Sequence, residues 1–245
     1  MQVTETIKYV GVNDHDIDLF EGQYDVRENG MAYNSYVVIG EKVAVADTVD
    51  ARFVDEWLGN IEAVLSGRKP DYLVVHHMEP DHSAGIVAFM DRYPDAQVVA
   101  SKMAFKMMAA YFGTDFSDRQ IVCKEGFELD LGGRTLRFIG AANVHWPEVM
   151  FSYDSQDKVL FPQMPLASLE QTISKILKAG LAKHAAIILE SWASSARTYR
   201  LFCRRLLRLM SNASVRFMAL CSLKIWRITW KRTPHGRITS PKTAA

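Results

Sequence analysis

The first 161 residues of the sequence predict an α/β sandwich, and three observations support this prediction. Short runs rich in β-branched and aromatic residues open the chain and recur before residue 161, which is typical of strands. Between them lie segments whose apolar residues recur every three or four positions, as in amphipathic helices. Strands and helices follow each other irregularly, so a layered sandwich is favoured over a regular doubly wound sheet.

The individual elements follow from the same patterns, taken in chain order. In the first helix Phe53, Trp57, Ile61 and Leu65 fall on one face, and Asp50 stands where an N-cap is expected. Residues 72–75 form a continuous apolar run, which predicts a buried strand. We expect strands over residues 7–12, 35–39, 42–47, 72–75, 97–100, 135–139, 149–153 and 158–161, and helices over 50–65, 83–93 and 102–111.

The charge of the chain divides it into two unlike parts. Its formal net charge is only +1, but residues 162–245 contain fifteen Lys and Arg against two acidic residues, Glu170 and Glu190. Residues 1–161 are correspondingly acidic. So abrupt a change predicts a boundary near residue 161, with a domain over 1–161 and a basic tail over 162–245.

Composition also limits the compartment and the class of protein. The N-terminus has no signal-peptide pattern, and no apolar run approaches the length of a membrane span. Cys123, Cys203 and Cys221 have no metal-ligand spacing and do not suggest a disulfide framework. We therefore expect a cytoplasmic protein that is not bound to a membrane.

The segment His77-Met78-Glu79-Pro80-Asp81-His82 carries the chemistry. Four potential metal ligands fall within six residues, directly after the predicted strand 72–75. In an extended segment His77 and Glu79 project to the same side and can share one metal, while a bend at Pro80 can direct Asp81 and His82 to a second. Imidazole and carboxylate ligands together suit iron or manganese, and they leave zinc open.

His145 is a further candidate ligand, because it lies in a loop just before the predicted strand 149–153 and could complete the first metal site. Other histidines have simpler explanations. His15 and His184 are isolated, and His76 should point to the opposite side of the strand from His77. Trp146 is expected to pack against the site. No catalytic residue beyond the metal ligands is apparent.

The pattern H-x-E-x-D-H resembles the flavodiiron proteins, also called A-type flavoproteins. Zinc hydrolases of the metallo-β-lactamase fold carry H-x-H-x-D-H after such a strand, and here Glu79 stands in place of the second histidine. The resemblance spans about residues 5–161. It implies a metallo-β-lactamase-like αββα sandwich, incomplete in this chain and followed by an aberrant basic C-terminal tail.

The resemblance also implies a function and a set of cofactors. His77, Glu79 and His145 would hold one iron, and Asp81 and His82 the other. Proteins of this family reduce O2 to water or NO to N2O at the two irons, with electrons from FMN on a flavodoxin domain, for which this sequence shows no counterpart. The electron donor would be rubredoxin or a flavin domain, and the parent protein would be a homo-oligomer.

The pattern of the family stops after residue 161. An aspartate that bridges the irons and a last histidine are expected there, but Met164 and Met218 stand in their places. Both residues return when the gene is read in a shifted frame, in which each codon consists of the last base of one original codon and the first two bases of the next. Gln163-Met164 must then give Asp or Asn, and Phe217-Met218 must give His or Tyr. A lost nucleotide near codons 161–162 explains the tail, so we expect an impaired chain with weakened metal binding.

Two other functions remain open from the sequence. The chain could be a zinc-dependent metallo-hydrolase of the same fold, although Glu79 argues against this. Alternatively, it could be a non-catalytic chain whose basic tail binds nucleic acid or an anionic membrane, but nucleic acid is not favoured because the tail contains no recognised binding motif.

Overall fold

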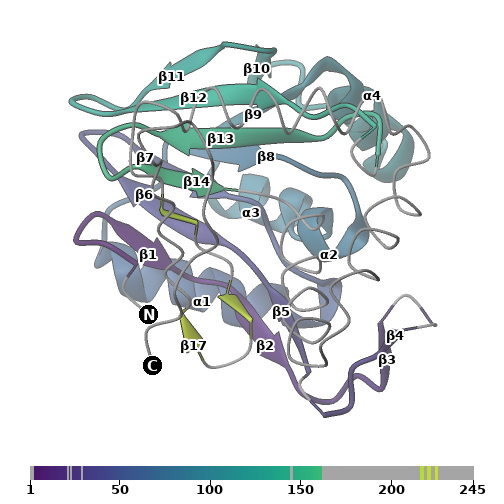
Figure 1. Cartoon of the computed structure of the whole chain (residues 1–245). Coiled ribbons are helices and arrows are strands. Elements are labelled where there is room, and N and C mark those ends of the chain that lie inside the picture. The colour runs from purple at the N-terminus through teal and green to yellow at the C-terminus, as the bar shows by residue number, and fades with distance from the viewer. Residues whose placement is uncertain are drawn as a thin grey trace, which may run out of the picture.

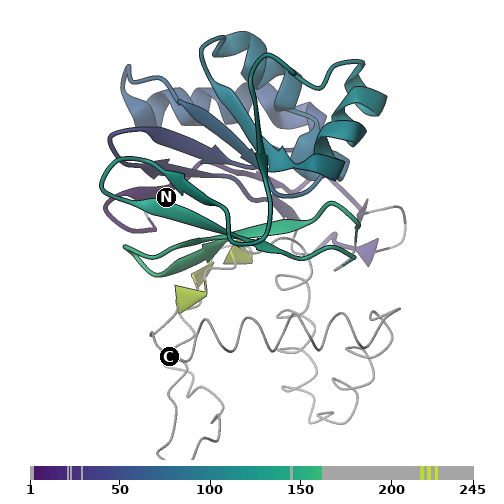
Figure 2. The ribbon, with the colours of Figure 1, turned by 90° about the horizontal axis from the view of Figure 1, so that it is seen from above.

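The computed structural model describes residues 3–20, 22, 24–28, 30–143 and 146–161, together with three short strands in the tail. The described elements form two stacked sheets, with helices on the outer face of the first sheet (Figures 1 and 2). The chain therefore has the metallo-β-lactamase-like arrangement that the sequence predicts. In this part of the chain, no helix has the length and apolar character needed to cross a bilayer.

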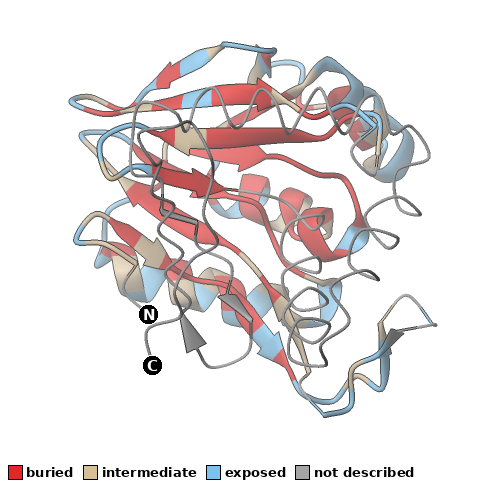
Figure 3. Cartoon of the chain, in the orientation of Figure 1, coloured by how far each residue is buried: buried red, intermediate tan, exposed pale blue. Residues whose placement is uncertain are grey.

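The first sheet has six strands in the order β1-β6-β7-β8-β9-β10. These strands are β1 (Ile7–Tyr9), β6 (Tyr36–Ile39), β7 (Val43–Ala46), β8 (Tyr72–Val75), β9 (Gln97–Ser101) and β10 (Gln120–Cys123). The pairs β1·β6 and β6·β7 are antiparallel, and the strands from β7 to β10 are parallel. Both faces of this sheet are covered, so β7 and β8 are apolar throughout and buried (Figure 3).

Helices cover one face of this sheet. They are α1 (Val54–Leu65), α3 (Ile86–Arg92) and α4 (Lys102–Phe112). Trp57, Ile61, Phe89 and Met108 are fully buried against the sheet side chains that point the same way. The apolar face predicted for the first helix is therefore the face that packs onto the sheet.

The second sheet packs on the other face and has the order β11-β12-β13-β14-β15. Its strands are β11 (Glu128–Asp130), β12 (Thr135–Gly140), β13 (Met150–Asp154), β14 (Val159–Phe161) and β15 (Arg216–Phe217). Val74, Phe138 and Phe161 are among the buried side chains that fill the space between the two sheets. Strand β15 pairs in parallel with β14, whereas the other pairs are antiparallel.

Several elements differ from the sequence-based expectations. The predicted strand 7–12 divides into β1 and β2 (Val12–Asp14), and β2 pairs with β5 (Met31–Tyr33) outside the first sheet. Asp50 caps a 3-10 turn, η1 (Ala51–Phe53), and α1 follows it. The hairpin β3 (Leu19–Phe20) with β4 (Tyr24–Asp25), and strands β10 and β11, were not expected. Most of these elements have two to four residues, too few to show a period.

The tail beyond residue 161 lies largely outside the described residues. Its described parts are β15 and the two-stranded pair β16 (Leu220–Cys221) and β17 (Lys224–Ile225). The expectation that the tail leaves the sandwich incomplete therefore concerns mostly residues that the structure does not describe.

Candidate metal centre

The candidate ligands lie where β8 ends, at the carboxyl edge of the parallel strands β7 and β8. From Val75 the chain passes through His76 and His77 into α2 (Pro80–Ser83), a single turn whose first residue is proline. Proline is favoured at the start of a helix because its missing N–H would be unpaired there anyway. The strand end and this short turn together direct the ligands predicted from the sequence into one region.

His77 lies at the centre of this region and is completely buried. Its Nε2 lies 3.0 Å from Glu79 Oε2, and its Nδ1 lies 2.7 Å from Glu148 Oε1. The ring of Trp146 meets the His77 ring edge-on, with centroids 5.2 Å apart. The expected packing of Trp146 against the site is thus found.

His82 and Asp81 lie near His77 and are buried. The rings of His82 and His77 are 5.4 Å apart between centroids, and His82 Nε2 lies 3.5 Å from Asp81 Oδ2. Neither ring nitrogen of His82, nor Oδ1 of Asp81, has a hydrogen-bond partner among the described residues. Buried polar atoms without partners are costly, so these three atoms are candidates to bind an ion.

Thr48, which follows β7, holds the short helix α2 in place through hydrogen bonds. Its backbone N–H and its hydroxyl both donate to the carbonyl of His82, at 3.0 and 2.9 Å. The same hydroxyl accepts a hydrogen bond from the backbone N–H of Gly85 at 3.0 Å. These contacts fix the position of the helix that carries Asp81 and His82.

His76 points away from the candidate ligands, as the alternation along a strand predicts. Its Nδ1 lies 2.7 Å from Asp47 Oδ2 and its Nε2 lies 2.8 Å from Ser152 Oγ. All three residues are buried, so this Ser-His-Asp arrangement has no access to substrate and does not constitute a nucleophilic site. It joins β7, β8 and β13 across the interior.

Burial and hydrogen bonds shift the pKa values of the charged groups in this region in opposite directions. Burial opposes protonation of His77, but hydrogen bonds to Glu148 and Glu79 raise the pKa of its imidazole to about 9. Burial raises the pKa of Asp81, and the nearby His82 lowers it only in part. Hydrogen bonds from His77 and from the Met78 N–H outweigh burial at Glu148 and hold the pKa of that carboxyl below its usual value.

The four described candidates, His77, Glu79, Asp81 and His82, thus come together, and their donors suit a metal. His145 lies outside the described residues. Within the described ranges, no three His, Cys, Asp or Glu side chains already form a group that could hold a metal. His77 and Glu79 instead bond to each other. The unpartnered atoms of Asp81 and His82 nevertheless fit a bound cation, and mixed nitrogen and oxygen donors suit iron.

Sequence reasoning missed Glu148, Asp47 and Ser152. Each contacts a histidine that lies far from it along the chain, between 29 and 76 residues away. No local pattern marks such pairs. The only available signal for Glu148 was its place three residues after His145.

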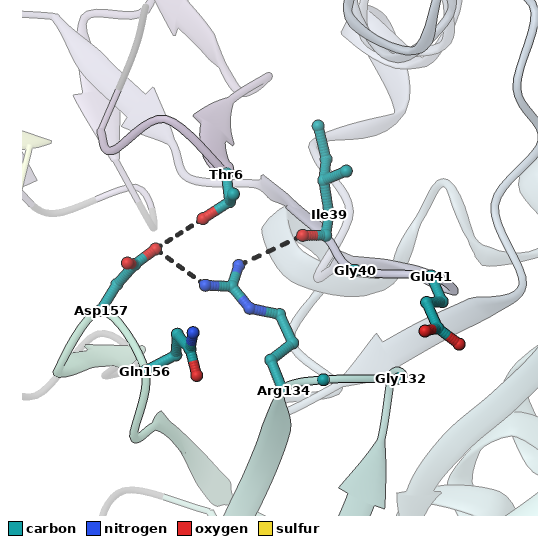
Figure 4. A pocket seen from close by; sticks show the side chains of 9 residues that line it. Thr6, Ile39, Gly40, Glu41, Gly132, Arg134, Gln156 and Asp157 are labelled. Carbon is teal, nitrogen blue, oxygen red and sulfur yellow. Dashed lines mark hydrogen bonds and ion pairs between the residues drawn. The ribbon is translucent and has the colours of Figure 1, made fainter.

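A separate pocket of about 240 Å³ is shown in Figure 4. It is lined by the turn around Gly40 and by Arg134, Gln156 and Asp157. Arg134 donates to Asp157 and to the carbonyl of Ile39, so its charge is already engaged. None of the candidate metal ligands lines this pocket.

Comparison with protein families and relatives gives a consistent result. Residues 31–219 match the family model described as ODP family beta lactamase. A nitric oxide reductase of Moorella thermoacetica is 35% identical over 161 residues, which are 65% of this chain and 40% of the relative. A putative diflavin flavoprotein A 2 of Synechocystis is 40% identical over 149 residues, covering 60% of this chain and 25% of the relative.

Solved structures show the same likeness. Rubredoxin oxygen:oxidoreductase from Desulfovibrio gigas superposes with a TM-score of 0.61 at 32% identity, over 65% of this chain and 39% of that protein. The flavodiiron protein of Giardia intestinalis gives a TM-score of 0.60 at 29% identity, over 65% and 38%. The chain therefore spans about two fifths or less of the length of these relatives.

Proposed function

Because the chain belongs to the ODP beta-lactamase family, we propose that its first 161 residues form the metal-binding part of a diiron oxidoreductase. The substrate would be O2 or NO. The relatives support this class of reaction, since one is a nitric oxide reductase and another a rubredoxin oxygen:oxidoreductase. In the proposed assignment His77, Glu79 and His145 hold one iron, and Asp81 and His82 hold the other.

The observation that carries the proposal is the buried cluster after β8. It places two imidazoles and two carboxylates together, and three of their donor atoms have no hydrogen-bond partner among the described residues. Two bound irons would supply binding and reduction of O2 or NO. The residues of the chain would hold the irons in place, and the ring of Trp146 packs nearly perpendicular to that of His77.

Electrons would come from FMN, held by a separate flavin domain or partner, or through a rubredoxin-type donor. The names of two relatives, a diflavin flavoprotein and a rubredoxin oxygen:oxidoreductase, support a flavin and a rubredoxin in this role. We further propose a cytoplasmic location and a homo-oligomeric parent protein.

We also propose that the tail results from a shifted reading frame, which impairs the site. Met164 and Met218 then occupy the positions of the bridging carboxylate and the last imidazole. The codons of Gln163-Met164 and Phe217-Met218 support this, because the shifted frame must give Asp or Asn and His or Tyr there. Sequencing the gene across codons 155–170 tests this proposal. A gene in which no nucleotide is missing relative to the frame that encodes the bridging aspartate would contradict it.

Metal analysis tests the proposed function against a zinc hydrolase. After expression in iron-replete medium, we expect the full chain to contain iron in excess of zinc, since a carboxylate at Glu79 suits iron. Glu79→His should shift the metal content toward zinc. Zinc as the predominant metal in the unaltered chain would instead favour the hydrolase.

A further inference from the structure

Glu148 is the most deeply buried carboxylate in contact with a candidate ligand. Its side chain and that of His77 are both fully buried, and its Oε1 lies 2.7 Å from His77 Nδ1. The same oxygen accepts the backbone N–H of Met78 at 3.0 Å. One carboxylate oxygen thus bonds to both the ring and the backbone next to it.

These two hydrogen bonds determine which nitrogen of His77 faces the candidate metal. With Nδ1 directed at Glu148, Nε2 is directed toward Glu79, at 3.0 Å from its Oε2. Histidine ligands commonly donate their second ring N–H to a carboxylate, which fixes the orientation of the ring and makes the ligating nitrogen more basic.

The backbone around Glu148 is itself held in place. The carbonyl of His76 accepts a hydrogen bond from the N–H of Met150 at 3.0 Å, and the N–H of Ala141 bonds to the carbonyl of Val149 at 3.0 Å. The segment that carries Glu148 is therefore attached both to the end of β8 and to β12. This attachment leaves Glu148 little freedom to move away from His77.

We propose that Glu148 is a positioning residue that holds His77 with Nε2 directed at the metal. That His77 binds a metal rests on the proposed function, whereas the orientation of its ring rests on the described geometry. It predicts that Glu148 raises the metal affinity of the chain without touching the metal.

The first test measures Co2+ affinity of the full chain by absorption titration. Glu148→Ala should weaken binding by about 10- to 100-fold, as is typical when such a partner is lost. Glu148→Gln should recover most of the loss, because its amide oxygen can accept both hydrogen bonds. Asp154→Asn removes the charge of another fully buried carboxylate, which pairs with Arg134, and should leave Co2+ affinity unchanged.

The second test needs no metal and separates this inference from the proposed function. In the metal-free protein, NMR should detect a slowly exchanging Nδ1–H of His77 in the unaltered chain and in Glu148→Gln. That signal should be absent from Glu148→Ala or, if that variant does not fold, from Glu148→Asp, whose shorter side chain does not reach both donors.

The outcomes are distinct. If the unaltered chain does not bind Co2+, the proposed function fails, and the NMR result alone decides the role of Glu148. An unchanged Nδ1–H signal in Glu148→Ala or Glu148→Asp would overturn the positioning role. Co2+ affinity equal to that of the unaltered chain in Glu148→Ala would overturn it as well.

Discussion

Asp47 has a left-handed backbone conformation, with a φ of 55° that residues other than glycine rarely adopt. Its carboxylate accepts the backbone N–H of His76 at 2.8 Å and also bonds to the ring of that histidine. Ser35 Oγ donates to the backbone carbonyl of Asp47 at 2.8 Å. Such strain persists only where surrounding contacts enforce it, and here they fix the strand end that leads to the candidate ligands.

Gly85 lies where α2 gives way to α3, and a side chain does not fit there. A Cβ would lie 2.9 Å from a ring carbon of Trp57 and 3.0 Å from Cβ of Thr48. The indole of Trp57 is buried and donates to Ser35 Oγ at 2.9 Å, so it cannot move freely. We expect Gly85→Ala to lower the free energy of unfolding by about 1–3 kcal/mol, measured by urea denaturation.

Gly59 provides the matched control for this prediction. It lies in α1, and a Cβ there meets nothing within 4 Å. Gly59→Ala should therefore stabilise the chain by up to about 1 kcal/mol, because alanine loses less backbone entropy in a helix. Equal effects of the two substitutions would show that the contact with Trp57 does not matter.

At the scale of elements, Asp157 connects the start of the chain to the second sheet. It lies in the turn between β13 and β14 and accepts hydrogen bonds from Thr6 and Arg134 at 2.6 and 2.9 Å (Figure 4). It also accepts one from Thr4 at 2.7 Å. Burial opposes its charge, but these hydrogen bonds outweigh burial and lower the pKa of the carboxyl. The turn thus joins segments more than 150 residues apart.

We predict that Asp157→Asn costs about 2 kcal/mol of unfolding free energy at neutral pH, the usual scale for hydrogen bonds to a charged group. Since the pKa is lower in the folded state, this stability is present above the unfolded pKa of about 4 and is lost as pH falls further. Urea denaturation at pH 7 and pH 3 should show a difference between the two proteins that shrinks in acid. A constant difference, or an equal loss in exposed Asp91→Asn, would contradict this.

The elements that could be predicted from sequence are those with a long enough pattern. Strand β8 is a continuous apolar run, and α1 buries Trp57, Ile61 and Leu65 on one face, so both were predicted closely. Strands β2 and β5 have three residues each and carry no recognisable period. The break between β1 and β2 falls at Val10 and Gly11, whose backbone N–H groups both bond to the carbonyl of Ser35, a contact that no local pattern reveals.

The candidate site was predictable for a similar reason. Its ligands crowd into six residues, so spacing alone places His77, Glu79, Asp81 and His82 together. Their supporting contacts join distant strands: Glu148 to His77, Ser152 to His76, and Thr48 to His82. Such contacts depend on how the two sheets pack together, which cannot be predicted from local sequence patterns.

For the whole molecule, the shifted-frame proposal predicts that restoring the frame strengthens metal binding. A gene with one nucleotide inserted near codon 161 should encode an aspartate at position 164 and a histidine at 218. We expect that protein to retain two irons per chain after desalting, whereas the chain with Met164 and Met218 should retain fewer. Equal retention by both proteins, measured by elemental analysis, would contradict the proposal.

We expect the cluster after β8 to bind metal, a claim that anaerobic equilibrium dialysis with Fe2+ can test. We expect the full chain to bind Fe2+ weakly, since the bridging carboxylate and last imidazole are replaced. His77→Ala and His82→Ala should each weaken binding by about 100-fold or more, beyond what loss of a supporting residue causes. His15→Ala, which changes an exposed histidine away from the cluster, should bind as the unaltered chain does. Equal Fe2+ binding by all four proteins would contradict the claim.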